Sequence, residues 1–371
     1  MEETSDLSVE LKRKLLGKLV LIDNLLDDYE KKYKEKTGKS AVAVLLAYYE
    51  GYYGFASIIR EHVEDLYSYL KRLKKEKATD KVDEVHVILH SPGGDGDAAY
   101  QMSRILHRFG QELRTRVIYV IPRFAKSAAT LMALGGSEIR MTEIAELGPI
   151  DPQVNFQGDY ISAIVVKSSM TGMLEAMLEA MYKFVKKDTN TDELAQEVLR
   201  ETVGVMVESV VRRFIGIGKY ESLVEYSKRV AEDLLSLSMF SEESESRGET
   251  RQNVDRIVDA LARSYPSHEM VIDYQAASKL GLKVSKVDDE LEDLLLEIYK
   301  TYHGLFEDLD YYWMRERPRV RPYLWRVRGI RHGMIVAPWP RDLDLSLNQS
   351  NSASSSNTSA PSLEQPSASG A

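Results

Sequence analysis

The stretch from Val85 to Gly94 reads VHVILHSPGG, a short apolar run that ends in Ser-Pro-Gly-Gly. A run of this length that stops at a turn is typical of a buried strand leading into a loop. The pair Gly93-Gly94 lets backbone N–H groups point into a cavity without side-chain obstruction, and a helix is expected over residues 98–109. The turn suits an anionic group, either a phosphate or the oxyanion of an acyl-transfer intermediate, although a purely structural tight turn has the same sequence.

A second unit of the same kind follows directly. Residues 115–121 have the pattern of another buried strand, which Pro122 ends, and residues 127–134 have that of a short helix. A third short strand is expected over residues 138–141. Strands and helices that alternate at this spacing predict a parallel α/β core with right-handed crossovers.

Ser127 opens the second of these helices, in the small-residue sequence AKSAAT, directly after a buried strand. A serine nucleophile needs this position, because its hydroxyl is exposed at a helix N-terminus and the next backbone N–H is free to hold an oxyanion. A plain N-cap serine has the same position. The Ser-Pro-Gly-Gly turn one strand–helix unit earlier favours the nucleophile.

The rest of the chain is expected to be mainly helical, because the strand pattern disappears beyond Asp159. Residues 7–77 have a helical pattern, with a break at 37–40 and a turn near 48–53. Later helices are expected over residues 161–237 (with breaks at 188–190 and 216–218), 254–263, 273–280 (capped by Gly281) and 289–302. The expected regions are an N-terminal helical region (1–80), a catalytic core (81–160 and 251–305), a helical insertion (161–250), a basic C-terminal extension (306–345) and a disordered Ser-rich tail (346–371).

Composition excludes several classes of protein. The chain has 371 residues, a formal net charge of −9 and no cysteine, which excludes disulfide-stapled folds and thiol chemistry. The acidic balance argues against nucleic-acid binding.

The acidic start, Met1–Asp6, does not resemble a secretory signal, so a cytoplasmic protein is expected. The amphipathic pattern from Leu11 to Leu26 allows a peripheral membrane contact, but packing on the protein itself is favoured.

Taken together, three segments resemble a known family. They are Ser-Pro-Gly-Gly at residues 91–94, Lys-Ser-Ala-Ala-Thr at residues 126–130 and Glu-Leu-Gly-Pro-Ile-Asp-Pro-Gln at residues 146–153. The order of strands, turns and helices around them resembles the Clp-protease/crotonase fold, and the segments are most similar to the serine dehydrogenase proteinase family. This resemblance implies an α/β fold with a Clp-protease/crotonase-like parallel sheet core, to which extensive helical additions and the disordered tail are attached.

The resemblance also implies a catalytic triad of Ser127, Asp151 and His268, and we expect the N–H groups of Gly94 and Ala128 to bind the oxyanion. The residue types suit these roles. A histidine is a useful base near neutral pH, and His268 lies in a Pro-flanked loop, where functional residues concentrate. Asp151 is an acid in an otherwise apolar turn, so it needs a specific partner, and it would orient His268.

A lysine base is the main alternative, since signal-peptide-peptidase-like relatives pair serine with lysine. Lys167 follows the apolar run Ala-Ile-Val-Val, where burial would lower its pKa. Lys126 is adjacent to Ser127, and adjacent side chains at a helix start point apart. His268 is therefore preferred over Lys167.

The predicted activity is that of a serine peptidase acting on peptides or unfolded proteins, without a metal or organic cofactor. Two alternatives stay open: a crotonase-type enzyme acting on acyl thioesters, and a non-catalytic scaffold. A homo-oligomer is also expected, because a stripe of methionines recurs at three- and four-residue steps and would need a partner to bury it. The stripe comprises Met170, Met173, Met177 and Met181.

Overall fold

A seven-stranded sheet forms the centre of the protein, with the strand order β11-β7-β5-β4-β1-β13-β12. The computed structural model describes residues 2–77, 81–156, 159–187, 201, 205, 218–241, 247–265, 267–316 and 325–340. The first six strands in this order run parallel, and β12 runs antiparallel to β13. The seven strands are β1 (Ala41–Tyr48), β4 (Glu84–His90), β5 (Arg116–Ile121), β7 (Glu138–Met141), β11 (Val284–Lys286), β12 (Arg326–Ile330) and β13 (Gly333–Ala337).

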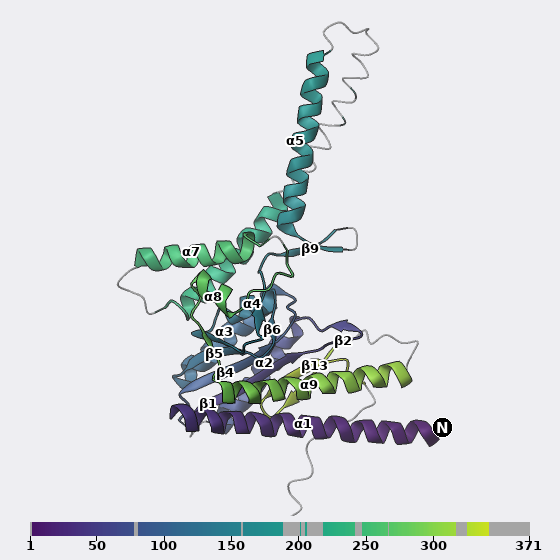
Figure 1. Cartoon of the computed structure of the whole chain (residues 1–371), viewed down its shortest axis with the longest axis vertical. Coiled ribbons are helices and arrows are strands. Elements are labelled where there is room, and N and C mark those ends of the chain that lie inside the picture. Colours follow the sequence, from purple (N-terminus) through teal and green to yellow (C-terminus); the bar gives the residue numbers. More distant parts are fainter. Residues whose placement is uncertain are drawn as a thin grey trace, which may run out of the picture.

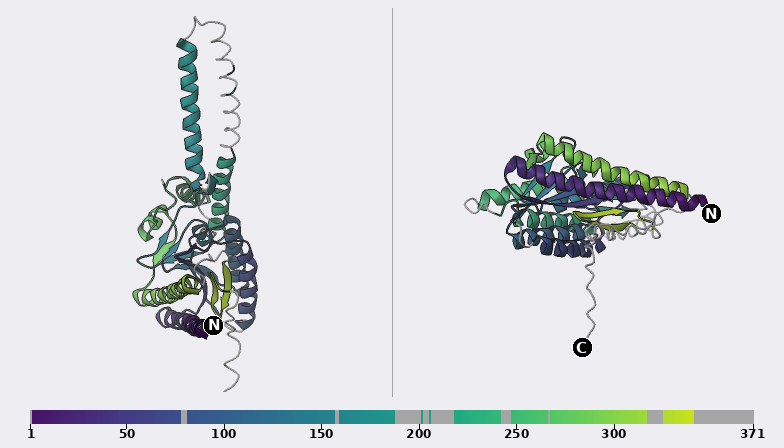
Figure 2. Two further views of the ribbon diagram at one scale, coloured as in Figure 1. Left: turned by 90° about the vertical axis from the view of Figure 1, so that its right-hand side faces the viewer. Right: turned by 90° about the horizontal axis from the view of Figure 1, so that it is seen from below.

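Helices cover both faces of this sheet. Figure 2 shows α1 (Glu2–Thr37) and α9 (Asp289–Glu316) on one face, with α2 (Glu61–Glu76) and α3 (Gly96–Leu113) on the other. Every residue of β4 and of β1 is buried, as a parallel strand between two helical layers requires. The three strands predicted from the sequence, β4, β5 and β7, are confirmed as neighbours, and so is the α/β class.

Residues 41–48 correct the prediction of an all-helical N-terminal region. They form β1, which pairs with β4 and β13 in the middle of the sheet. The run reads AVAVLLAY and shows no alternation of apolar and polar residues, because both of its faces are buried. A short apolar run without alternation cannot be told from a buried helical segment by its pattern alone.

The segment predicted as a basic extension, residues 306–345, also contributes strands. β12 and β13 form a hairpin there, and β13 is buried between β1 and the edge strand β12. Arg326 and Arg328 lie on that half-exposed edge, where charged residues guard against further strand pairing. The short strands β10 (Asp159–Ser162) and β11 likewise show that strand structure continues beyond Asp159.

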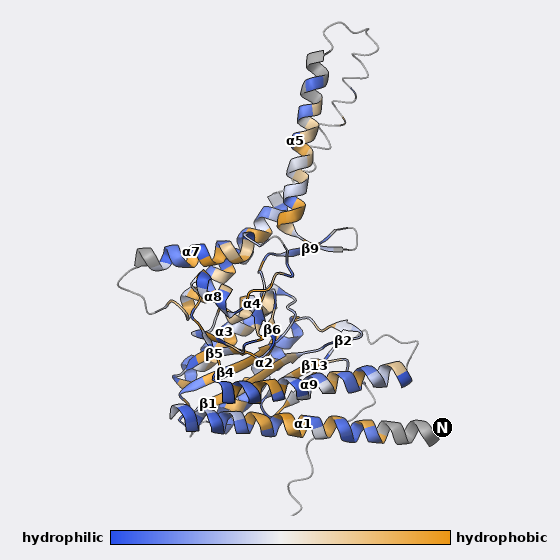
Figure 3. Cartoon of the chain, in the orientation of Figure 1, coloured by the Kyte–Doolittle hydropathy of each residue, from blue (hydrophilic) through white to orange (hydrophobic). Residues whose placement is uncertain are grey.

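A long helix projects from the body of the protein. Figure 1 shows α5 (Ala163–Lys187) extending away from the sheet, and Figure 3 shows apolar residues along it. Residues 218–237 form another helix, while the break predicted at 188–190 and the predicted tail at 346–371 lie outside the described residues. None of the described helices has the length and apolarity needed to cross a bilayer.

The other predicted helices of the later chain are confirmed. They are α7 (Arg247–Arg263), which begins earlier than the predicted residue 254, α8 (Tyr274–Leu280), and α9, which begins at Asp289 as predicted but extends further than residue 302. Gly281 caps α8 with a φ of 95°, a conformation that favours glycine.

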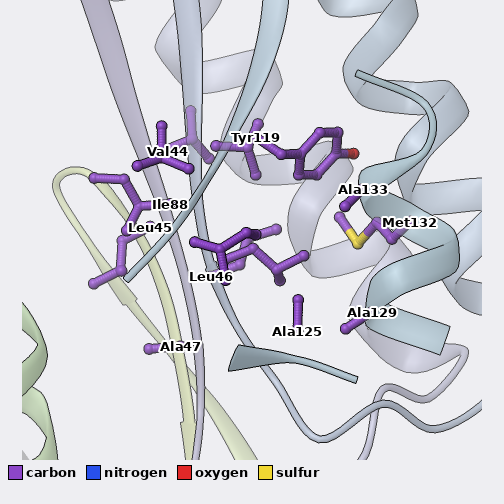
Figure 4. Close-up of a cluster of buried hydrophobic side chains, with 14 of the residues drawn as sticks. Val44, Leu45, Leu46, Ala47, Ile88, Tyr119, Ala125, Ala129, Met132 and Ala133 are labelled. Carbon is purple, nitrogen blue, oxygen red and sulfur yellow. The ribbon is translucent and has the colours of Figure 1, made fainter. Parts of the chain in front are cut away.

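Close packing holds the small helix α4 (Ala128–Ala133) against the sheet. Figure 4 shows Ala129, Met132 and Ala133 of this helix beside Leu46 of β1 and Tyr119 of β5. All five side chains are fully buried. Alanines leave room for the helix to approach the strands, so the first turn of α4, which directly follows Ser127, rests on a close-packed base.

A buried polar cluster lies at the start of β4. The Glu84 side chain is only 1% exposed and accepts hydrogen bonds from Tyr33 (2.6 Å), Arg116 (2.7 Å) and Arg140 (3.2 Å). Burial alone would raise the pKa of Glu84, but hydrogen bonds from His86 and these neighbours hold it well below its usual range. The carboxylate therefore stabilises the folded state only while it is ionised.

Glu84→Gln should lower the free energy of unfolding by about 3 kcal/mol at pH 7, because it removes the buried carboxylate that pairs with the half-buried Arg140 and the more exposed Arg116. Since the folded-state pKa is depressed, this stabilisation is present above the unfolded value of about 4.3 and is lost as the pH falls below it. Urea unfolding at pH 7 and pH 3 measures the effect, and the difference in the free energy of unfolding between wild type and variant should narrow at pH 3.

Glu112→Gln is the control, because it removes an exposed ion pair with Lys74. It should lower the free energy of unfolding by less than about 1 kcal/mol, and a loss equal to that of Glu84→Gln would contradict the prediction.

Candidate active site

A cleft of about 1020 Å³ lies at the carboxyl ends of the parallel strands. Ligands of open α/β sheets bind at this edge, because the loops that follow the strands meet there. The cleft is lined by the turn after β4, the turn before α4, residues between 50 and 59, the helix over residues 218–237 and two loops from later in the chain. Ser127, Asp151 and His268 all lie in its wall, together with Gly94 and Ala128.

Ser127 has a strained backbone. Its φ of 51° and ψ of −119° are rare for a residue with a Cβ atom, and such strain of about 1–3 kcal/mol clusters at functional sites. The Ser127 side chain makes no capping hydrogen bond to α4, so this residue is not an ordinary N-cap. Ala128 is the first residue of α4, and its N–H therefore has no acceptor within the helix.

The glycine turn packs directly against Ser127. A Cβ atom on Gly93 would lie 2.8 Å from Ser127 Cβ, and the φ of 109° at this residue also favours glycine. The N–H of Gly93 donates to Ser91 Oγ (3.1 Å). Gly94 forms a parallel bridge with Ile58. The hydrogen bonds of this bridge are made by the backbone groups of the residues on either side of Gly94, so the N–H of Gly94 itself points away from Ile58. Neither the N–H of Gly94 nor that of Ala128 has a hydrogen-bond acceptor among the described residues.

Asp151 and His268 form a close pair. Asp151 Oδ1 lies 2.7 Å from His268 Nδ1, and the Asp151 and His268 side chains are 8% and 20% exposed. Gln153 donates to the other carboxylate oxygen of Asp151 (3.0 Å). The carboxylate is therefore held from both sides, and the ring nitrogen Nε2 of His268 is left for another partner. No hydrogen bond joins Ser127 to His268 in the described part of the chain.

Backbone contacts bring these two distant segments together. Leu147 and Ile272 form an antiparallel bridge with N···O distances of 2.9 and 3.0 Å. The N–H of Ile150 donates to the carbonyl of Leu261 at the end of α7 (3.0 Å). These contacts attach the loop with Asp151 to the segments before and after His268. They therefore hold the side chains of Asp151 and His268 close together.

The two lysines considered as bases are engaged elsewhere. Lys126 lines the cleft but forms an ion pair with Glu146 (3.2 Å). Lys167 lies on α5, where it pairs with Glu221, and it is absent from the lining of the cleft. Arg263 also binds Glu221, so Lys167 belongs to a charged cluster outside the cleft.

The strained serine lies beside a glycine turn at the carboxyl edge of a parallel sheet, where its hydroxyl can act as a nucleophile next to free backbone N–H groups. Residues 51–204 match the family model of the ClpP-like SDH-type serine proteinases. The match spans less than half of the chain, and over these residues it confirms the resemblance found in the sequence.

Two curated relatives come from the archaeon Methanocaldococcus jannaschii. The uncharacterized protein MJ0137 is 40% identical over 96 residues, which are 26% of this chain and 31% of that protein. The uncharacterized protein MJ1495 is 33% identical over 84 residues, which are 23% of this chain and 26% of that protein. The chain thus covers less than a third of the length of either relative.

Solved structures resemble the chain only distantly. Two are variants of the 1510-N membrane-bound stomatin-specific protease, one of them in complex with a substrate peptide. They are 13% and 12% identical, cover 67% and 70% of this chain and 76% and 83% of theirs, and both have a TM-score of 0.36. A peptidase from Plasmodium falciparum is 10% identical with a TM-score of 0.31, over 66% of this chain and 95% of that one.

Sequence reasoning missed three supporting residues. Gln153 holds Asp151, and Ser91 accepts the N–H of Gly93. Thr130 donates to the carbonyl of Ala125 (2.6 Å) and accepts the N–H of Gly148 (3.0 Å), which ties α4 to the loop of Asp151. Each lies inside a segment that the sequence singled out, but its partner is known only from the fold. Among the described residues, no cluster of three or more histidines and carboxylates is arranged to hold a metal.

Proposed function

We propose that this protein is a serine peptidase that cleaves peptide bonds with Ser127 as nucleophile, His268 as general base and Asp151 as the residue that orients the base. The observation that carries this proposal is the Asp151–His268 pair in the same cleft as the strained Ser127. The match to the ClpP-like SDH-type serine proteinases supports it. The absence of a hydrogen bond between Ser127 and His268 does not count against it, because such bonds tighten when substrate binds.

The reaction follows from these contacts. His268 keeps a proton on Nδ1 for Asp151, so that Nε2 accepts the proton of the Ser127 hydroxyl as Oγ attacks the scissile carbonyl. The N–H groups of Gly94 and Ala128 bind the oxyanion. The imidazolium then protonates the leaving amine. In the second half of the reaction water attacks the acyl group with His268 again as the base, and the Ser127 hydroxyl is restored as the leaving group. Peptides and unfolded segments are the substrates, since a folded chain does not fit such a cleft.

A fluorophosphonate probe tests this function. It should label the folded protein on Ser127 alone, as identified by mass spectrometry of the tryptic peptides. His268→Ala should slow the labelling strongly, since the serine loses its base. A folded protein that stays unlabelled would instead favour a crotonase-type or non-catalytic relative.

We further infer that α5 mediates assembly with other copies of this chain. The helix projects from the body (Figure 1), and Met173 on it is 49% exposed while Val165 is 45% exposed. A projecting helix with apolar side chains on its surface gains free energy by burying them against a partner.

Sedimentation at micromolar concentration should therefore show a species larger than the 42.1 kDa monomer. Met173→Glu should weaken the association by about tenfold or more, because it would place a charge in the buried interface. Lys183→Glu alters an exposed residue of the same helix and should have a smaller effect. A monomer at every concentration tested would show that α5 has no such role.

A further inference from the structure

The cleft that contains Ser127 is strongly acidic. Six carboxylates line it, against a single lysine, Lys126. Most of the six have a partner within the protein. Asp95 caps α3, Asp97 binds Arg60 and Tyr226, Glu146 binds Arg123 and Lys126, and Asp151 binds His268. Glu50 and the exposed Glu269 have neither lysine nor arginine within ion-pair distance among the described residues.

Glu50 lies on the short strand β2 (Glu50–Gly51) and is only 19% exposed. Its Oε1 accepts a long hydrogen bond from Tyr299 (3.4 Å) and lies 3.8 Å from ring nitrogens of His90 and His303. The other oxygen, Oε2, takes no hydrogen bond or ion pair from the described residues. The positive charge of Arg123 acts to lower the pKa of Glu50, but the Arg123 side chain forms its ion pair with Glu146 and not with Glu50.

His90 does not compensate the charge of Glu50. Its ring is fully buried, neither of its nitrogens has a hydrogen-bond partner, and burial lowers its pKa to about 3. The imidazole is therefore neutral at ordinary pH. Burial likewise raises the pKa of Glu50, against the opposing effect of His303, as expected for a carboxylate without a close cation.

Two phenylalanines of the cleft lining are neighbours of Glu50 or of its partner His90. Phe55 of β3 (Gly54–Phe55) lies directly opposite Glu50 in the β2–β3 pair and also lines the cleft. Phe124 packs on His90 with ring centroids 4.2 Å apart, and it lies three residues before Ser127. Apolar rings beside a carboxylate suit the methylene stem and charged end of a long basic side chain.

We propose that Glu50 is the specificity-determining residue of a subsite that receives a lysine or arginine side chain of the peptide substrate. The inference rests on the proposed peptidase function of Ser127. The stem of the basic side chain packs between Phe55 and Phe124, and its charged end binds Oε2 of Glu50. Since His90 and Phe124 directly precede the two turns that flank the reaction centre, the bound side chain belongs to a residue close to the scissile bond.

N-acetylated peptides that differ at one position test this subsite. The acetyl group removes the terminal amine, so that only the side chain carries positive charge. The varied residue is lysine, arginine, norleucine or glutamate, and each position near the scissile bond is varied in turn. At pH 8, where an ordinary imidazole of pKa about 6.5 is neutral, the wild type should cleave the best lysine peptide at least about tenfold faster, in kcat/KM, than its norleucine counterpart.

Glu50→Gln should lower kcat/KM for that lysine peptide by about 10- to 100-fold and leave the norleucine peptide within about twofold. Glu50→Asp keeps the charge and should retain part of the preference. Glu269→Gln is the matched control, because it removes an exposed carboxylate from the same cleft. An equal loss for both peptides in Glu50→Gln, or the same loss of preference in Glu269→Gln, would overturn the assignment.

Binding separates this inference from the peptidase proposal. Calorimetry with Ser127→Ala, which cannot hydrolyse the peptides, should show the lysine peptide binding about tenfold more tightly than the norleucine peptide, and Glu50→Gln in that background should abolish the difference. A binding preference without hydrolysis by the wild type would refute the peptidase function and leave the subsite standing. Hydrolysis without any preference for basic side chains would refute the subsite alone.

Discussion

Ser127→Ala should lower kcat/KM for peptide hydrolysis by about 10⁴-fold or more. The change deletes the only atom that forms the covalent bond to the acyl group, and the remaining hydrogen bonds in the cleft then act on an uncatalysed attack by water. The fold should persist, because alanine and serine experience the same backbone strain at a φ of 51°. Peptide hydrolysis is followed by mass spectrometry, and thermal unfolding of the variant should match that of the wild type.

Ser57→Ala provides the matched control. Ser57 also lines the cleft and is exposed, so this variant removes a hydroxyl from the same wall without touching the proposed nucleophile. Its activity should stay within about threefold of the wild type. Near-normal hydrolysis by Ser127→Ala would refute the proposed mechanism, and a large loss in Ser57→Ala would show that the assay reports general damage to the cleft.

The local patterns of the sequence account for the centre of the fold. β4 with its glycine turn, and β5 with the turn at Ser127, are short apolar runs that end at Gly or Pro, so each can be recognised from a few neighbouring residues. β1 could not be predicted in this way, because its run of alanine, valine and leucine is buried on both faces and shows no alternation of apolar and polar residues. β13 lies next to arginine-rich sequence, and only its pairing with β1 shows that it belongs to the sheet.

The candidate site divides in a similar way. Ser127 and the glycines follow buried strands, so their position at one edge of a parallel sheet can be predicted from local sequence. Asp151 and His268 are far apart along the chain, and no local pattern predicts that they meet at 2.7 Å. Their assignment came from family resemblance, and their roles in catalysis stay predictions until variants of each residue are assayed. Glu50 could not be singled out from the sequence, because a glutamate in a predicted turn has no distinguishing feature until the fold places it in the cleft.

His268→Ala should reduce kcat/KM nearly as much as Ser127→Ala, since members of a triad act as a unit and their losses do not add. Asp151→Asn should also be severe, because an amide that donates to Nδ1 favours the wrong tautomer of the imidazole. Lys167→Ala serves as the control and should be mild, because it removes an ion pair with Glu221 outside the cleft. The double variant of Ser127 and His268 should be no slower than Ser127→Ala.

The activities of the single variants separate the two candidate bases. Lys167→Ala should leave hydrolysis nearly unchanged, whereas His268→Ala removes the group that accepts the proton of the Ser127 hydroxyl. If Lys167→Ala abolishes hydrolysis while His268→Ala is mild, a Ser-Lys dyad replaces the triad, and the pair of Asp151 and His268 then serves only to hold the loops together.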